Sequence, residues 1–94
     1  MSEDGARVLV VDDEAAIRRF LHVSLEAHGY AVTEADSGQA AMSAVTAQRP
    51  DVIVLDLGLP DVDGLDVTRM LREWTQIPII ILSVRGQEED KIAA

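Results

Sequence analysis

The chain of 94 residues contains no cysteine. Disulfide bonds, thiolate metal sites and a cysteine nucleophile are therefore excluded. Basic residues are also scarce, with 8 lysines and arginines against 17 acids and a formal charge of −9. Because nucleic acid and anionic lipid both attract a positive patch, we expect this chain to bind neither of them directly.

Long apolar runs are absent as well. The longest, residues 79–82 with Ile77 and Pro78 before it, falls far short of the ~20 residues that a membrane-spanning helix needs. Residues 1–7 carry two acids and no apolar stretch, unlike a secretory signal. We therefore expect a soluble, cytoplasmic protein with no membrane partner. A chain of this length is expected to form at most one domain, so residues 1–94 are assigned to a single domain.

Four short apolar runs are spaced along the chain and predict four β-strands. They are residues 8–11, 30–33, 52–55 and 79–82. Three of them are continuous valine, isoleucine and leucine, which is typical of strands covered on both faces. The second run is weaker and suits a strand at the edge of a sheet.

Helical periodicity fills the intervals between these runs. The first face has residues at i, i+3, i+4, i+8 and i+11, namely Ile17, Phe20, Leu21, Leu25 and His28, and Gly29 ends the helix. Ser37 caps a second helix, whose narrow face is Ala40, Ala41, Ala44 and Val45. A third helix follows Asp63 and Gly64, with a core face of Val67, Met70, Leu71 and Trp74. A fourth helix is expected to begin near Gln87.

Alternating strands and helices predict an open α/β fold, with a parallel sheet, right-handed crossovers and helices on both faces. Ligands of such sheets bind beyond the carboxyl ends of the strands. The first run is followed by Asp12 and Asp13, the third by Asp56 and the fourth by Ser83. If the strand order is 2-1-3-4, the three aspartates form a carboxylate cluster.

Such a cluster requires a cation or a proton. Two unit charges about 4 Å apart repel by about 4 kcal/mol at an effective dielectric near 20. Oxygen ligands with open positions favour Mg²⁺. The alternative is that Asp12 or Asp13 is only the N-cap of the next helix.

The remaining polar residues are interpreted as structural. Three acids, Asp61, Asp63 and Asp66, are expected to cap and charge the start of the third helix. His22 and His28 have no partners at metal-ligand spacing, which favours a surface or core-packing role over catalysis.

Three blocks of sequence carry a resemblance to a known family. They are VLVVDDE at 8–14, IVLDLGLPDVDG at 53–64 and PIIILS at 78–83. Together they resemble the receiver domain of bacterial two-component response regulators, over essentially the whole chain. Finer matches, AIRRFL at 16–21, DLGLPD at 56–61 and DKIAA at 90–94, are similar to regulators of the potassium-transport (Kdp) type.

The resemblance implies a flavodoxin-like parallel sheet and a signalling domain that is not an enzyme beyond self-phosphorylation and self-dephosphorylation. Asp56 matches the residue that accepts a phosphoryl group from a sensor histidine kinase. Asp12 and Asp13, with Asp56 and the backbone carbonyl of Gly58, match the ligands of Mg²⁺. Ser83 matches the switch hydroxyl that bonds the phosphoryl oxygen.

The chain also departs from the family pattern. The fifth strand with its terminal lysine, the aromatic switch residue and the closing helix have no match, so residues 1–94 are interpreted as a receiver truncated at its C-terminal side, without an output domain. The strand at 79–82 would then leave an apolar edge, and we expect a homodimer or other self-association through it.

Two alternatives stay open. One is a receiver-like interaction domain that is not phosphorylated. The other is a phosphohydrolase with Asp56 as nucleophile, although such enzymes usually have an acid two residues further on, where this chain has Gly58.

Overall fold

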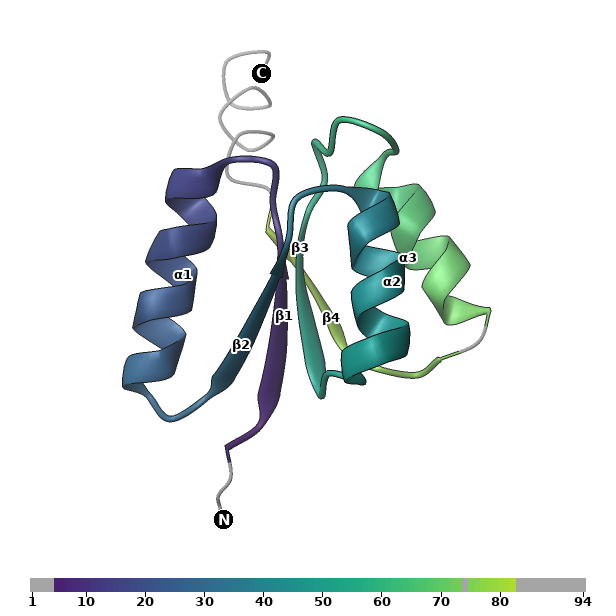
Figure 1. Ribbon diagram of the computed structural model, residues 1–94. Helices are drawn as coiled ribbons and strands as arrows, with labels where there is room; N and C mark the ends of the chain where they lie inside the picture. Colours follow the sequence, from purple (N-terminus) through teal and green to yellow (C-terminus); the bar gives the residue numbers. More distant parts are fainter. Residues whose placement is uncertain (1–4, 74, 83–94) are drawn as a thin grey trace, which may run out of the picture.

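The computed structural model describes residues 5–73 and 75–82. Within these residues strands and helices alternate strictly (Figure 1). The strands are β1 (Arg7–Val11), β2 (Ala31–Ala35), β3 (Val52–Asp56) and β4 (Ile79–Leu82), and the helices are α1 (Ala15–Ala27), α2 (Gly38–Gln48) and α3 (Gly64–Arg72).

The strands form one parallel sheet in the order β2-β1-β3-β4. The predicted fold class and the edge position of β2 are thus confirmed. The second strand begins at Ala31, one residue after the start of its predicted run, because the backbone N–H of Tyr30 donates back to the carbonyl of Leu25 at 3.1 Å.

One face of the sheet carries the main core. Leu9 and Ile53 alternate onto this face and are fully buried. They pack with Val67 and Leu71 of α3 and with the small-residue face of α2, as predicted. Figure 1 shows α2 and α3 together on this side and α1 alone on the other. Fully burying one such aliphatic side chain contributes about 1.5–3 kcal/mol.

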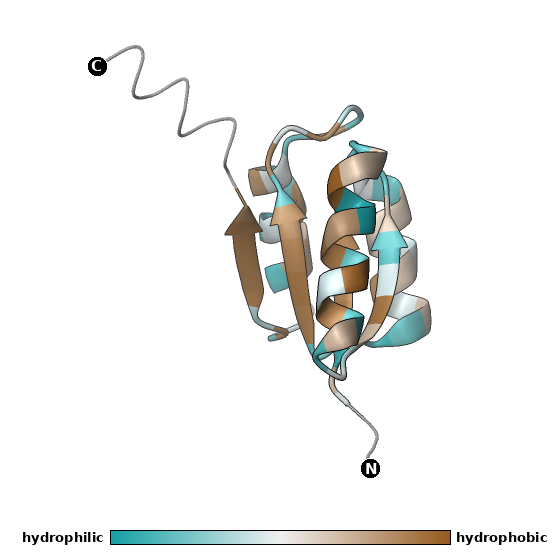
Figure 2. Cartoon of the chain, turned by 90° about the vertical axis from the view of Figure 1, so that its left-hand side faces the viewer, coloured by the Kyte–Doolittle hydropathy of each residue, from teal (hydrophilic) through white to brown (hydrophobic). Residues whose placement is uncertain are grey.

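The opposite face is covered less completely. Within α1 no residue is fully buried, and Phe20, predicted to face the core, is 68% exposed. Val8 and Val10 of β1 are buried, whereas Ile80 of β4 is 55% exposed. In Figure 2 the brown arrows of β3 and β4 lie beside α1 and are not covered by it.

Other local predictions have mixed outcomes. Gly29 has a φ of 92° and ends α1 as predicted. Met70, predicted as core, is 37% exposed. Trp74 and the expected fourth helix near Gln87 lie outside the described residues. In the described part of the chain no helix has the length and apolar character to cross a membrane.

Candidate functional site

Two neighbouring strands end in aspartates at the same edge of the sheet. Asp12 and Asp13 directly follow β1, and Asp56 is the last residue of β3. Because β1 and β3 are paired and parallel, their carboxyl ends meet, and one carboxylate oxygen from each aspartate lies within 4.8 Å of the others. Asp12 and Asp56 are 1% and 5% exposed, while Asp13 is exposed.

The backbone fixes Asp12 in this position. Its N–H donates to the carbonyl of Ala35 at 3.1 Å, which extends the β1–β2 ladder by one bond. Its Oδ1 accepts a hydrogen bond from the N–H of Glu14 at 2.8 Å. Glu14, and not either aspartate, is the N-cap of α1, and its side chain makes no capping bond. The alternative that Asp12 or Asp13 is simply the N-cap is therefore wrong.

The segment after Asp56 is a short loop, residues 57–63, that leads into α3. The N–H of Gly64 donates to the carbonyl of Leu57 at 3.0 Å and closes the base of the loop. Asp63 caps α3 through the N–H of Leu65 at 2.9 Å, as predicted. Gly58 is exposed within this loop.

Ser83 lies outside the described residues. The residue before it, Leu82, is the register partner of Asp56 in the β3–β4 pair. The fourth strand thus ends beside the same acidic edge.

Asp61 does not have its predicted role. Instead of capping α3, its two carboxylate oxygens accept hydrogen bonds from Gly38 N at 2.8 Å and Gln39 N at 3.0 Å, in the first turn of α2. Asp66 does lie in the first turn of α3, where its charge suits the helix dipole.

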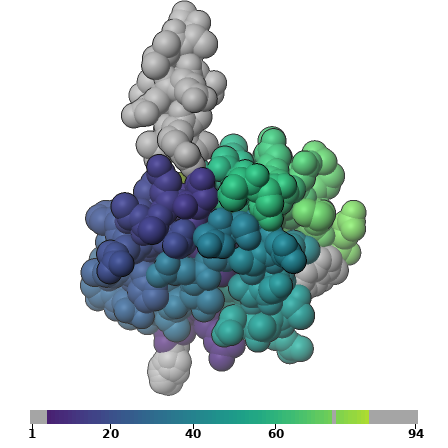
Figure 3. Space-filling view, turned by 45° about the horizontal axis from the view of Figure 1, so that its top comes forward, coloured from purple at the N-terminus to yellow at the C-terminus, as the bar shows by residue number. Residues whose placement is uncertain are grey.

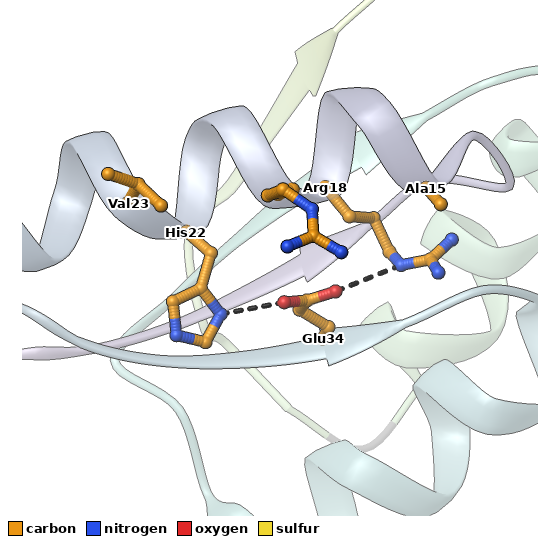
Figure 4. A pocket seen from close by; sticks show the side chains of 6 residues that line it. Ala15, Arg18, His22, Val23 and Glu34 are labelled. Atoms are coloured by element: carbon orange, nitrogen blue, oxygen red, sulfur yellow. Dashed lines mark hydrogen bonds and ion pairs between the residues drawn. The ribbon is translucent and has the colours of Figure 1, made fainter.

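Arg18 of α1 is a neighbour of the site that the sequence analysis did not identify. Its guanidinium donates to the backbone carbonyl of Asp12 at 2.8 Å and to Glu34 of β2 at 3.0 Å. Glu34 also contacts His22, so the histidine has a polar partner at the surface. Figure 4 shows His22 and Arg18 approaching the Glu34 carboxylate from two sides. A backbone carbonyl acceptor leaves no sequence signal, which is why Arg18 was missed.

The donor set of the acidic group fits a hard divalent cation. Three carboxylates offer only oxygen, two of them from nearly buried positions, and Mg²⁺ is usually held by one or two carboxylates together with water and phosphate. Figure 3, in which the top of Figure 1 comes forward, shows the surfaces of the segments after β1 and β3 close together, beside the start of α2.

Comparison with known proteins agrees with this geometry. Residues 8–94 match the response regulator receiver domain family. The KDP operon transcriptional regulatory protein KdpE of Escherichia coli is 52% identical over 93% of this chain, and the transcriptional regulatory protein KdpE of Mycobacterium tuberculosis is 47% identical over 93%. The chain spans 39% and 38% of the lengths of these two relatives.

Solved structures show the same fold and the same type of domain. The receiver domain of the Francisella response regulator 1452 superposes with a TM-score of 0.83 and 34% identity, covering 95% of this chain and 74% of that one. An acidic group such as Asp12, Asp13 and Asp56 is typical of the magnesium site of receivers. The chain therefore belongs to the response regulator receiver domain family, whose members are signalling domains, and its relatives of the KdpE type are transcriptional regulators.

Proposed function

We propose that this domain accepts a phosphoryl group on Asp56 from a sensor histidine kinase. The observation that carries the proposal is the convergence of three carboxylates within 4.8 Å, in a chain of the receiver family. Asp56 ends an almost wholly apolar strand, so its carboxylate is fixed at the strand tip and nearly buried, at 5% exposure. A fixed anionic oxygen at that position is an available nucleophile.

The phosphoryl transfer forms one bond to phosphorus and breaks another. A carboxylate oxygen of Asp56 forms a bond to phosphorus while the bond from phosphorus to the donor histidine nitrogen breaks, leaving an acyl phosphate and a free imidazole. Asp12, Asp13 and Asp56, with the carbonyl of Gly58, would hold Mg²⁺. When bound, the ion supplies positive charge against the oxygens of the transferring group.

Ser83 is proposed as the residue that senses the phosphorylated state. Its hydroxyl would hydrogen-bond a phosphoryl oxygen and so couple the event at β3 to the segment after β4. Ser83→Ala is expected to spare phosphoryl acceptance and to weaken that coupling.

The output of the domain is proposed to lie in a longer protein. The relatives are called transcriptional regulatory proteins, and this chain matches less than half of each. With a charge of −9, the domain is poorly suited to contact DNA, so DNA binding is assigned to a separate output domain. A cytoplasmic location belongs to the same proposal.

Treatment with acetyl phosphate and Mg²⁺, followed by mass spectrometry of the intact protein, tests the proposal. The wild type is expected to gain one phosphoryl group. Asp56→Asn removes the anionic nucleophile and is expected to gain none. Asp51→Asn is the matched control: Asp51 precedes the same strand at its other end, where it accepts from Arg7 N at 2.7 Å. Labelling of Asp56→Asn would contradict the assignment, and an unlabelled wild type would favour an interaction domain that is not phosphorylated.

A further inference from the structure

The loop at residues 57–63 is hydrogen-bonded to α2 through the side chain of Asp61. Both carboxylate oxygens of Asp61 accept backbone hydrogen bonds, one from Gly38 and one from Gln39. These two bonds stabilise the ionised form and hold the pKa of Asp61 below its ordinary value. The donors are 23 and 22 residues away along the chain, so the contact is tertiary and does not extend α3.

The same contact is also closely packed. A Cβ added at Gly38 would lie 2.1 Å from Val62 Cγ1 and 3.1 Å from Val67 Cγ2. Only a glycine therefore lets the loop approach the first turn of α2 so closely. Figure 3 shows the green surface of the loop directly against the start of α2.

The other end of the loop is held against β3. The Gly64 N–H bonds to the carbonyl of Leu57, and a Cβ at Gly64 would lie 2.8 Å from the carbonyl oxygen of Asp56. The loop is thus held at Leu57 by the bond from Gly64 and at Asp61 by the two bonds from α2. Gly58 lies between Leu57 and Asp61 along the chain.

Helix α2 already has a cap of its own. The Ser37 hydroxyl accepts from Ala40 N at 3.1 Å. Ser37 and Asp61 both satisfy donors at the start of α2. Of these two residues, only Asp61 belongs to the loop and connects it to that helix. The two residues can therefore be separated by mutation.

We propose that Asp61 is a positioning residue: by binding the first turn of α2 it fixes the loop that carries Gly58 beside Asp56, and so prepares the acidic site for Mg²⁺ and the phosphoryl group. The inference rests on the proposed function of Asp56. Asp61 acts through the loop backbone and is not itself assigned to the ligands.

The test compares three variants, Asp61→Ala, Asp61→Asn and Ser37→Ala, at a temperature where thermal melts show all of them folded. Mg²⁺ is titrated while backbone amide shifts are followed by NMR, and the rate of labelling by acetyl phosphate is measured at low and high Mg²⁺.

Asp61→Ala is expected to raise the Kd for Mg²⁺ about tenfold. This is near the lower end of the loss of metal affinity that typically follows when a residue supporting the ligands is removed. Its labelling is expected to slow at low Mg²⁺ and to recover at high Mg²⁺. Asp61→Asn is expected to be intermediate, because an amide offers one acceptor oxygen for two donors. Ser37→Ala is expected to lower the melting temperature and leave Mg²⁺ affinity unchanged.

The inference is overturned if Asp61→Ala binds Mg²⁺ like the wild type, or if Ser37→Ala weakens binding as much as Asp61→Ala does. A wild type that neither binds Mg²⁺ nor is labelled would instead remove the proposed function, and the positioning role with it. The two failures are distinguished by the wild type alone.

Discussion

Nδ1 of His22 on α1 lies 2.7 Å from a carboxylate oxygen of Glu34 on β2. The other ring nitrogen of His22 lies 3.0 Å from Glu26, and the second oxygen of Glu34 accepts from Arg18. His22, Arg18 and Glu34 line one surface pocket (Figure 4). Arg19 also lines this pocket. Since Arg18 also donates to the carbonyl of Asp12, this network ties α1 both to β2 and to the end of β1.

The network predicts a pH dependence of stability near neutrality. Burial lowers the pKa of His22. The hydrogen bonds with Glu34 and Glu26 and the charges of these two residues together raise it by more, so the pKa lies above the ordinary 6.5. The folded state therefore favours the proton. The stabilisation from His22 is complete below about pH 6.5 and is lost as the pH rises through the folded pKa.

The pKa of Glu34 is shifted in the opposite direction from that of His22. Burial raises its pKa, but the hydrogen bonds from Arg18 and His22 lower it more, to below the ordinary 4.5. Its stabilisation is present above about pH 4.5 and is lost as the pH falls through the folded value. NMR titration of His22 in wild type and in Glu34→Gln checks this relationship. The variant is expected to lower the pKa of His22, and an unchanged pKa would show that the contact does not form in solution.

The close approach at Gly38 predicts a strong effect of a single methyl group. Alanine is ordinarily the better helix former, by about 1 kcal/mol, but its Cβ would overlap the stiff side chain of Val62. We expect Gly38→Ala to lower the free energy of unfolding by about 1–3 kcal/mol, as overpacking typically does. Urea unfolding measures the change.

A double variant separates overlap from other causes. In Gly38→Ala combined with Val62→Ala, the overlapping methyl group is gone, so most of the loss caused by Gly38→Ala is expected to be recovered relative to Val62→Ala alone. If the two effects simply add, steric overlap is not the reason for glycine at this position.

At Arg49, in contrast to Gly38, a substitution is expected to raise the free energy of unfolding. It ends α2 in the left-handed conformation, with a φ of 49°, which glycine adopts without steric cost. Arg49→Gly is expected to raise the free energy of unfolding by about 0.5 kcal/mol, the relief of strain being offset in part by the greater freedom of glycine in the unfolded chain. Gln48→Gly, one residue earlier and inside the helix, is the matched control and is expected to cost about 1 kcal/mol.

The sequence predicted the features that depend on local spacing or on strand direction. Ser37 and Asp63 cap helices through donors two or three residues away, so their role follows from the pattern alone. Asp12, Asp13 and Asp56 meet because parallel strands end at a common edge.

The errors have a common physical origin in tertiary contacts. Asp61 was assigned to the nearest helix, yet its donors belong to α2. Phe20 fits the helical period of α1, but the side chains that turn toward the sheet are its half-buried neighbours Ile17, Leu21 and Leu25. Periodicity alone does not fix which edge of an apolar stripe meets the sheet.

The acidic group itself supports a final prediction, on metal binding. Asp13 is chosen for substitution because its side chain is exposed, so that the two buried carboxylates of the group, Asp12 and Asp56, stay unchanged. Because Asp13→Asn removes one of three negative charges, we expect weaker Mg²⁺ binding and a smaller stabilisation by the ion. For the wild type, Mg²⁺ at ten times its Kd would raise the free energy of unfolding by about 1.4 kcal/mol.

Thermal melts with and without millimolar Mg²⁺ measure this difference for wild type and variant, and EDTA is expected to reverse the shift in both. Asp36→Asn is the matched control, because Asp36 is an exposed aspartate just beyond β2 and lies outside the group of three. It is expected to respond to Mg²⁺ like the wild type. An equal shift in Asp13→Asn and the wild type would show that the ion, if it binds, is held elsewhere, because ligands that lose a third of their charge cannot keep the same affinity for a hard divalent cation.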